Sequence, residues 1–321
     1  MAAAALGLLL LRVLTSPPRV AGVPSGHLIT LQADTSSAQT SHGLFVAGTD
    51  GASRLLARDE PQDAVSGIRE QITQPVLSPD GTQLAFERQW TTLQNGAAST
   101  DNQLWVMPMT SDTRSPPHLV LDLTRQKLKQ IVGLAWDSDS SLLFLEDGAS
   151  YSVATETDDA PLVTPLDLHG LTLAKMDAVS ATRSPALTES GVFAYAAQTP
   201  SGPQILTQSQ ERTTPGPAAA VFALSPAGDV IAFVPPGSPS VIRRYDLTHP
   251  STLTDIPVHW GWSLGHRQIT SLRWSPDGSA IACTVSKSPA SDNELFLVTP
   301  ATGQTVQLPY RTVPDAWDWG K

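Results

Sequence analysis

Residues 261–265, GWSLG, have the G-x-S-x-G pattern that marks the nucleophile of many serine hydrolases. In those enzymes the serine lies between a strand and a helix, and an acid and a histidine base follow later in the chain. Here residues 268–274 alternate like a strand, and the one histidine after Ser263 is His266, three residues on. Because the serine has no suitable base, we interpret the pattern as a chance match and predict no catalytic residue.

Carboxylates and imidazoles are the next groups that could do chemistry, as metal ligands. A calcium loop would need a third oxygen donor, a glycine and a distal glutamate at fixed spacing around the aspartates, and these are absent. The histidines show no His-x-His or His-x-x-x-His spacing, which argues against a zinc site. We therefore predict no metal and no cofactor. The aspartates in question are Asp137, Asp139, Asp158 and Asp159, and the histidines are His27, His42, His118, His169, His249, His259 and His266.

Tryptophans near predicted strand ends are candidates for contacts with a partner. Trp260, Trp262, Trp317 and Trp319 flank predicted loops or strand ends. One interpretation is packing between sheets. The other is a docking patch, because exposed tryptophan is enriched where binding energy concentrates. The loop with His259, Trp260 and Trp262 is the best candidate for binding a partner.

The composition bounds the class of protein. A chain of 321 residues with 40% hydrophobic residues can build a core, and its length suggests two domains or a repeat architecture. A net charge of −10 and five scattered lysines argue against nucleic-acid binding, which needs clustered positive charge. The single cysteine, Cys283, excludes an intrachain disulfide and lies in an apolar run, so we expect a small buried side chain.

The N-terminal residues 1–22 form an apolar segment distinct from the rest of the chain. The run 2–11 is too short to span a bilayer, which takes about 20 residues. It resembles the apolar core of a secretory signal, although no Lys or Arg precedes it and no A-x-A site follows. We expect a signal or anchor remnant and a periplasmic or other extracytoplasmic location, with the cytoplasm as the alternative. We predict no membrane span beyond this segment.

The stretch 268–308 carries four short apolar runs of strand character. Between the first two, residues 275–278 read Ser-Pro-Asp-Gly. Pro276 presets its own φ near −65°, and Gly278 can adopt a positive φ without steric cost, so a tight turn is predicted. A second glycine turn, Thr302-Gly303, joins the last two runs. The pattern indicates an antiparallel unit of four strands in about forty residues.

Further copies of this unit account for the rest of the chain. We expect residues 90–102 to be a long, polar, exposed loop, residues 215–217 (Pro-Gly-Pro) to end the fourth copy, and residues 166–183 to hold an insertion. The copies cover residues 27–57, 72–123, 131–165, 189–208, 221–257 and 268–308.

The two ends of the chain carry incomplete units. Residues 313–321 resemble a first strand and its turn, and the unit at 27–57 lacks a first strand. Pairing them removes two sheet edges and closes a ring. The sequence therefore predicts an all-β fold, a six-bladed β-propeller of four-stranded antiparallel blades over residues 23–321.

The repeats resemble the TolB-type, WD-repeat-like propeller family. Residues 77–86 and 273–284 match its strand, Ser-Pro-Asp-Gly and strand pattern, and residues 223–233 match with Ala227 in place of the aspartate. The resemblance covers residues 27–321 and implies a rigid protein-docking platform in the bacterial cell envelope. It covers the propeller domain only, without the N-terminal α/β domain of TolB.

Two functions follow from these observations. The first is a non-enzymatic, monomeric propeller that binds a protein or peptide on one face or at the mouth of its central channel. The alternative is a lactonase or esterase-type hydrolase with a metal in the channel, which needs acids from several first strands. The first strands at 72–77, 131–136, 221–224 and 268–274 are poor in acids, which favours binding.

Overall fold

The chain folds into antiparallel β-structure, as the alternating apolar runs predict. In the computed structural model, the described residues form strands and turns and no helix. Among them there is therefore no helix that is long and apolar enough to cross a membrane. The structure describes residues 27–33, 42–47, 53–59, 69–94, 97–109, 116–128, 131–138, 141–146, 149–155, 163–165, 186–187, 193–199, 202–209, 212–219, 221–250, 252–259, 268–286, 293–312 and 317–320.

The strands of the described ranges form six sheets of four strands each. The first sheet has the order β24 (Trp317–Gly320), β1 (His27–Ala33), β2 (His42–Ala47) and β3 (Ser53–Arg58). The second comprises β4 (Arg69–Leu77), β5 (Gln83–Gln94), β6 (Ala97–Pro108) and β7 (His118–Asp122). The third comprises β8 (Ile131–Ser138), β9 (Ser141–Glu146), β10 (Ala149–Ala154) and β11 (Val163–Pro165).

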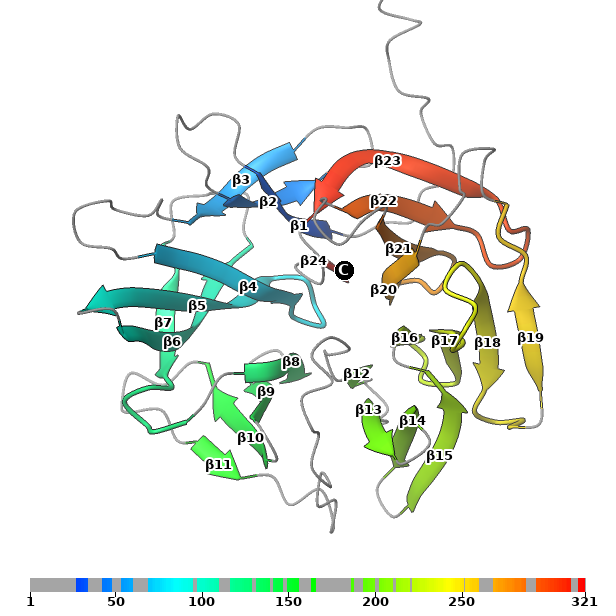
Figure 1. Cartoon of the computed structure of the whole chain (residues 1–321), viewed down its shortest axis with the longest axis horizontal. Helices are drawn as coiled ribbons and strands as arrows, with labels where there is room; N and C mark the ends of the chain where they lie inside the picture. Colours follow the sequence, from blue (N-terminus) through cyan, green and yellow to red (C-terminus); the bar gives the residue numbers. More distant parts are fainter. Residues whose placement is uncertain are drawn as a thin grey trace, which may run out of the picture.

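The other three sheets follow the same plan. The fourth comprises β12 (Ala186–Leu187), β13 (Phe193–Thr199), β14 (Gly202–Ser209) and β15 (Arg212–Ala218). The fifth comprises β16 (Val221–Leu224), β17 (Val230–Val234), β18 (Ile242–Asp246) and β19 (Leu253–Ile256). The sixth comprises β20 (Gln268–Trp274), β21 (Ile281–Ser286), β22 (Asn293–Val298) and β23 (Thr305–Thr312). In Figure 1 the strands β24, β4, β8, β12, β16 and β20 surround the centre of the view.

Serine-proline turns join the first two strands of the second, fifth and sixth sheets. Gly81, Gly228 and Gly278 have φ values of 74°, 74° and 71°, the positive values that the turn requires. In the sixth sheet Ser275 Oγ accepts a hydrogen bond from Ala280 N at 2.9 Å and donates one to Asp277 at 2.6 Å. The predicted positive φ of the turn glycine is confirmed, and the serine bonds to both sides of the turn.

Buried apolar clusters lie between successive sheets rather than within one central core. Ile29 and Leu44 of the first sheet pack in one cluster with Ile72 and Phe86 of the second. Equivalent clusters join the second sheet to the third, the fourth to the fifth, the fifth to the sixth and the sixth to the first. The first, second, fifth and sixth sheets thus bury both of their faces against neighbours, which explains why their middle strands are apolar on both sides.

Tryptophans near the ends of two inner strands tie neighbouring sheets together. Trp136 of β8 donates its indole N–H to the carbonyl oxygen of Val76 in β4 at 3.0 Å. Trp274 of β20 does the same to Ala223 of β16 at 3.1 Å. A buried indole N–H needs an acceptor, and here the main chain of the adjacent inner strand supplies it.

The two ends of the described chain meet in one sheet, as the incomplete units predict. β24 pairs antiparallel with β1, in register from His27↔Gly320 to Thr30↔Trp317. Trp317 is fully buried and Trp319 nearly so. Packing, rather than docking, is therefore the role of these two tryptophans.

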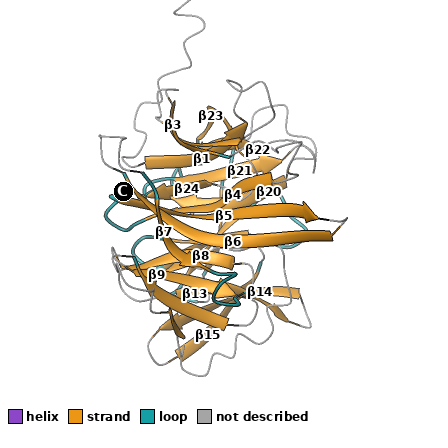
Figure 2. Cartoon of the chain, turned by 90° about the vertical axis from the view of Figure 1, so that its left-hand side faces the viewer, coloured by secondary structure: helices purple, strands orange, loops and turns teal. Residues whose placement is uncertain are grey.

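The predicted polar loop at 90–102 is wrong, because these residues belong mainly to two long strands. β5 and β6 pair without interruption from Gln83↔Pro108 to Gln94↔Ala97. Figure 2 shows them extending past the neighbouring strands. The segment Asn95-Gly96 is a strong hairpin signal between strands, and the many Gln, Asn, Ser and Thr residues around it concealed the alternation.

Residues 215–217 lie at the end of the fourth unit, as predicted, but inside its last strand, which the sequence did not reveal. β15 runs through Pro215, Gly216 and Pro217, with a register shift in its pairing between Gln204 and Leu206. Proline lacks the N–H that a central strand needs, yet it is tolerated on an outermost strand and at a bulge. The segments 1–22, 166–183 and 189–191 lie outside the described residues.

Candidate functional site

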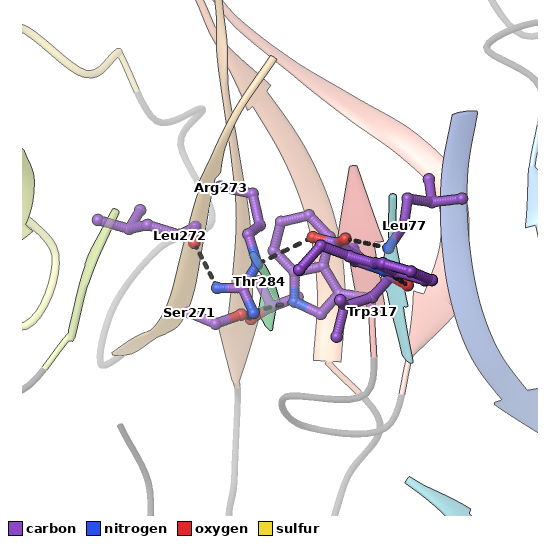
Figure 3. A network of polar contacts seen from close by, with 9 residues as sticks. Leu77, Ser271, Leu272, Arg273, Thr284 and Trp317 are labelled. Atoms are coloured by element: carbon purple, nitrogen blue, oxygen red, sulfur yellow. Dashed lines mark hydrogen bonds and ion pairs between the residues drawn. The ribbon is translucent and has the colours of Figure 1, made fainter. Parts of the chain in front are cut away.

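Three inner strands, β24, β4 and β20, meet in a polar network, which Figure 3 shows from close by. Asp318 of β24 accepts a hydrogen bond from Leu77 N of β4 at 2.8 Å, and its other oxygen lies 3.3 Å from Arg273 Nε of β20. Arg273 also donates to the carbonyl oxygen of Leu272 at 2.9 Å, and its guanidinium lies 5.7 Å from the Trp317 ring. One carboxylate therefore joins three sheets.

A chain of hydroxyl groups continues from this network into the sixth sheet. Trp317 donates its indole N–H to Ser271 Oγ at 2.6 Å, and Ser271 bonds with Thr284. Thr284 bonds with Thr270 at 2.8 Å, to which Asn293 donates at 2.6 Å. An indole and hydroxyl groups cannot take a proton from Ser271 at neutral pH, so the chain fits a structural role and not a nucleophilic one.

A second cluster lies where the β5–β6 hairpin leaves the sheet, and we call it the Arg88 patch: Glu70, Arg88, Trp90, Gln103 and Trp105. Arg88 Nε lies 3.2 Å from Glu70 Oε1, and its guanidinium lies 4.9 Å from the Trp105 ring. Trp105 donates its indole N–H to Gln103 at 3.1 Å. Arg88, Trp90 and Trp105 are partly exposed, whereas Glu70 is buried. Partly exposed tryptophan and arginine held in fixed positions are the residues that dominate protein interfaces.

The register places these side chains on one face of the second sheet. Trp90 lies opposite Glu70 on one side and Asp101 on the other. Arg88, two residues before Trp90 on β5, lies opposite Gln103. Residues that alternate along a strand share a face, so the patch is continuous from the sheet to the projecting hairpin.

The opposite face of the same sheet buries an acid. Thr73 donates its hydroxyl to Glu87 Oε2 at 2.9 Å, and Glu87 is completely buried. Loss of hydration raises the pKa of Glu87 from 4.5 to about 7. Next to it, Gln74 has a positive φ of 50° at a bulge in β4 and donates its amide to Ile131 of β8 at 2.7 Å.

A further acid connects the first and second sheets. Asp59, directly after β3, accepts a hydrogen bond from Ile72 N at 2.8 Å, and its other oxygen lies 3.7 Å from His42 Nδ1. Burial raises the pKa of Asp59 from 3.8 to about 6. Its role, like that of Asp318, is to satisfy the main chain of a neighbouring inner strand.

The predicted partner-binding loop is visible only at its first residue. His259 is exposed, and its main-chain N–H donates to the Gly303 carbonyl oxygen at 3.1 Å. Gly303 has a φ of 71°, and a Cβ there would overlap the Pro257 carbonyl oxygen. Trp260, Trp262 and the G-x-S-x-G pattern at 261–265 lie outside the described residues.

Of the other residues that the sequence analysis singled out, some are described in the structure and others are not. Cys283 is fully buried with a raised pKa caused by desolvation, as expected of a small core side chain. Of the four aspartates considered as calcium ligands, none has a described side chain. Within the described part of the chain, no group of three or more His, Cys, Asp or Glu residues could hold a metal ion.

Sequence reasoning missed the Arg88 patch. The polar sequence around Trp90 predicts a loop, and Arg88 belongs to no motif. A signal was present: from Phe86 to Trp90, every second residue is aromatic or basic. This period of two places the three side chains on one face of a strand.

Comparisons with known proteins bear on the fold. No family model matches the chain, and no curated protein matches its sequence. The structure of a putative TolB from Agrobacterium tumefaciens superposes with a TM-score of 0.53 at 12% identity, covering 94% of this chain and 100% of that chain. The likeness is one of fold.

Two further solved structures are similar over most of the chain. A putative 6-phosphogluconolactonase from Bacteroides fragilis has a TM-score of 0.48 at 13% identity, covering 92% of this chain and 98% of that one. The β-propeller domain of the trilobed protease from Pyrococcus furiosus has a TM-score of 0.41 at 14% identity, covering 91% and 98%. At such identities one fold carries several functions, so the function must be argued from the site.

Proposed function

We propose that this chain is a non-enzymatic, monomeric six-bladed β-propeller that binds a protein partner. Two observations support the architecture: buried clusters join five pairs of successive sheets, the sixth and first among them, and β24 pairs with β1. In this proposal each sheet is one blade, and the β24–β1 pairing closes the ring. A closed ring is rigid, which suits a docking platform because binding then orders few residues.

The observation that carries the binding function is the Arg88 patch. Its arginine is held between Glu70 and the Trp105 ring, and Trp90 continues the surface toward the projecting hairpin. Side chains that are fixed before binding lose little entropy on contact. A partner that covers this patch would bury two tryptophans and one arginine.

The two inner-strand carboxylates whose side chains are described are used in a way that favours binding over hydrolysis. Glu70 of β4 pairs with Arg88, and Asp318 of β24 pairs with Arg273 and Leu77 N. The negative charge of a carboxylate that is paired with an arginine is already balanced inside the protein. The TolB-like fold adds support for a location in the bacterial envelope, which we include in the proposal.

Affinity capture with point variants tests this function. The immobilised chain is exposed to envelope and cytosolic fractions of its source organism, alongside the Trp90→Ala variant. Arg243→Ala is the control, because Arg243 is a partly exposed residue paired with Asp255 in the fifth sheet. We expect one partner, recovered from the envelope fraction, whose affinity falls at least tenfold with Trp90→Ala and stays unchanged with Arg243→Ala.

Two results would contradict the proposal. Equal recovery of the partner by wild type and Trp90→Ala would remove the Arg88 patch as the binding surface. Recovery from the cytosolic fraction alone would remove the envelope location.

A further inference from the structure

The β5–β6 hairpin extends beyond both strands that flank it. β4 reaches along β5 only to the pair Arg69↔Thr91, and β7 reaches along β6 only to the pair Gln103↔Asp122. Residues 97–102 of β6 therefore pass the last paired residue of β7. No strand of the described ranges pairs with this side of residues 97–102, so β6 is an edge strand there, and edge strands offer unpaired main-chain groups.

The direction of these main-chain groups follows from Asn102. Its carbonyl oxygen accepts a hydrogen bond from Leu123 N at 3.0 Å, and its N–H donates to Thr124 Oγ1 at 3.1 Å, so both groups point away from β5. Alternate residues of a strand point the same way. Thr100 and Ala98 therefore direct their N–H and C=O groups outward, while Ser99 faces β5.

The edge lacks the usual protection against pairing with another chain. Residues 97–101, Ala-Ala-Ser-Thr-Asp, are all exposed and include no lysine or proline. Natural edge strands carry such residues, or bulges, to prevent strand addition. Here the β5–β6 register is free of shifts along the whole hairpin. A straight, exposed and nearly neutral edge fits an added strand.

The negative charge at and around this edge indicates which kind of segment would bind there. Asp101 is exposed and lies on the face of the Arg88 patch, opposite Trp90. A residue added beside Asp101 would share this face, where a lysine or arginine complements the carboxylate. A second copy of this chain would bring another net charge of −10, which disfavours pairing between copies. The side chains of Ala98 and Thr100 on the other face leave room for small or β-branched neighbours.

We propose that residues 97–101 of β6 accept an extended peptide segment as an additional strand, with a basic residue beside Asp101. This inference rests on the proposed binding function and assigns its mode: the partner covers the Arg88 patch and adds a strand to the adjacent edge. Main-chain hydrogen bonds supply the attachment, and the charge at Asp101 supplies the preference.

A synthetic peptide provides the probe. A blocked heptapeptide that alternates threonine and lysine is added to the full chain, and binding is measured by fluorescence anisotropy. Amide hydrogen exchange locates the site. We expect saturable binding with at least tenfold slower exchange at Ala98 and Thr100. The same peptide with glutamate for lysine should bind at least tenfold more weakly. A version N-methylated at alternate amides should not bind.

Variants of the edge make the test specific. Thr100→Pro removes one outward N–H and leaves the hairpin hydrogen bonds to β5 in place, whereas Thr100→Ala keeps the N–H and removes the side chain. We expect binding to be lost in the first variant and kept within twofold in the second. The N-methylated peptide also tests whether main-chain hydrogen bonds hold the peptide, and it does so without changing the chain. The test therefore remains decisive if Thr100→Pro alters the folding of the hairpin.

The outcomes separate the two proposals. Equal binding to Thr100→Pro and wild type, tolerance of N-methylation, or protection elsewhere in the chain would overturn strand addition. So would a dimer of the chain, seen by sedimentation, that Thr100→Pro dissolves. If capture of the native partner depends on Trp90 but not on Thr100, the binding function stands and strand addition fails.

Discussion

Glu87 and Asp59 are carboxylates that folding removes from water, and the pKa of each rises because burial disfavours the charged form. Both belong to the contacts between inner strands: Glu87 accepts from Thr73, and Asp59 from Ile72 N. Their raised pKa values mean that the folded chain binds protons more tightly than the unfolded chain. The stability that these groups provide is therefore complete at low pH and is lost as the pH rises.

For Glu87 the loss falls in the pH range between its two pKa values. The stabilisation is present below pH 4.5 and disappears as the pH rises through about 7. A shift of this size corresponds to about 3 kcal/mol. We expect Glu87→Gln to raise the free energy of unfolding at pH 8 by about 2 to 3 kcal/mol, with little change at pH 4. Urea unfolding across this pH range measures the effect.

Asp101→Asn serves as the control for that experiment, because Asp101 is exposed on the hairpin. Its pH profile should follow that of wild type. A Glu87→Gln profile parallel to wild type would mean that Glu87 does not stay buried and protonated in the fold.

At the scale of elements, the short strand β24 contacts other inner strands through two of its residues, Trp317 and Asp318. Trp317 is fully buried in a cluster with Leu28 and Leu295, and it bonds with Ser271. Its neighbour Asp318 bonds with β4 and β20. A four-residue strand thus contributes packing and hydrogen bonds to the interface with the sixth sheet, and a hydrogen bond to the interface with the second.

Replacement of Trp317 tests this role. We expect Trp317→Ala to lower the free energy of unfolding by about 3 to 5 kcal/mol, because it leaves a large cavity and removes the donor to Ser271. Trp90→Ala, on the partly exposed hairpin face, should cost less than about 1 kcal/mol. Chemical unfolding compares the two. Similar small losses in both would show that β24 adds little to the fold.

The hairpin shows where sequence reasoning fails at this scale. Strand periodicity is clear in β20 and β21, where apolar side chains mark the buried positions. It is hidden in β5 and β6 beyond Arg88, because residues 97–101 face water on both sides and no apolar pattern is required. Hydrogen bonds of the main chain, which do not depend on side-chain type, keep the strands paired there.

At the scale of the whole molecule, the proposed ring depends on the contact between its two ends. Removal of residues 313–321 would expose the inner edge of β1 and deprive Leu77 N and Arg273 of Asp318. We expect the melting temperature to fall by about 10 °C or more, with aggregation through the open edge. Differential scanning calorimetry and light scattering detect both changes.

A deletion elsewhere provides the comparison. Replacing residues 91–100 by Asn-Gly shortens the projecting hairpin and leaves the pair Trp90↔Asp101 beside the new turn. The melting temperature should change by less than about 3 °C. If both deletions have the same small effect, the ends do not close the ring.

Local structure was determined by the amino-acid sequence alone. Alternating apolar runs, proline and turn glycines predicted the four-stranded units and the positive φ at Gly278, because these features depend on residues close together in the chain. Only the tertiary structure decided the surroundings of each polar group. Asp318 meets Leu77, 241 residues away, and Arg88 meets the ring of Trp105. The environment of a charge depends on which sheets pack together, and that packing is settled by the whole chain.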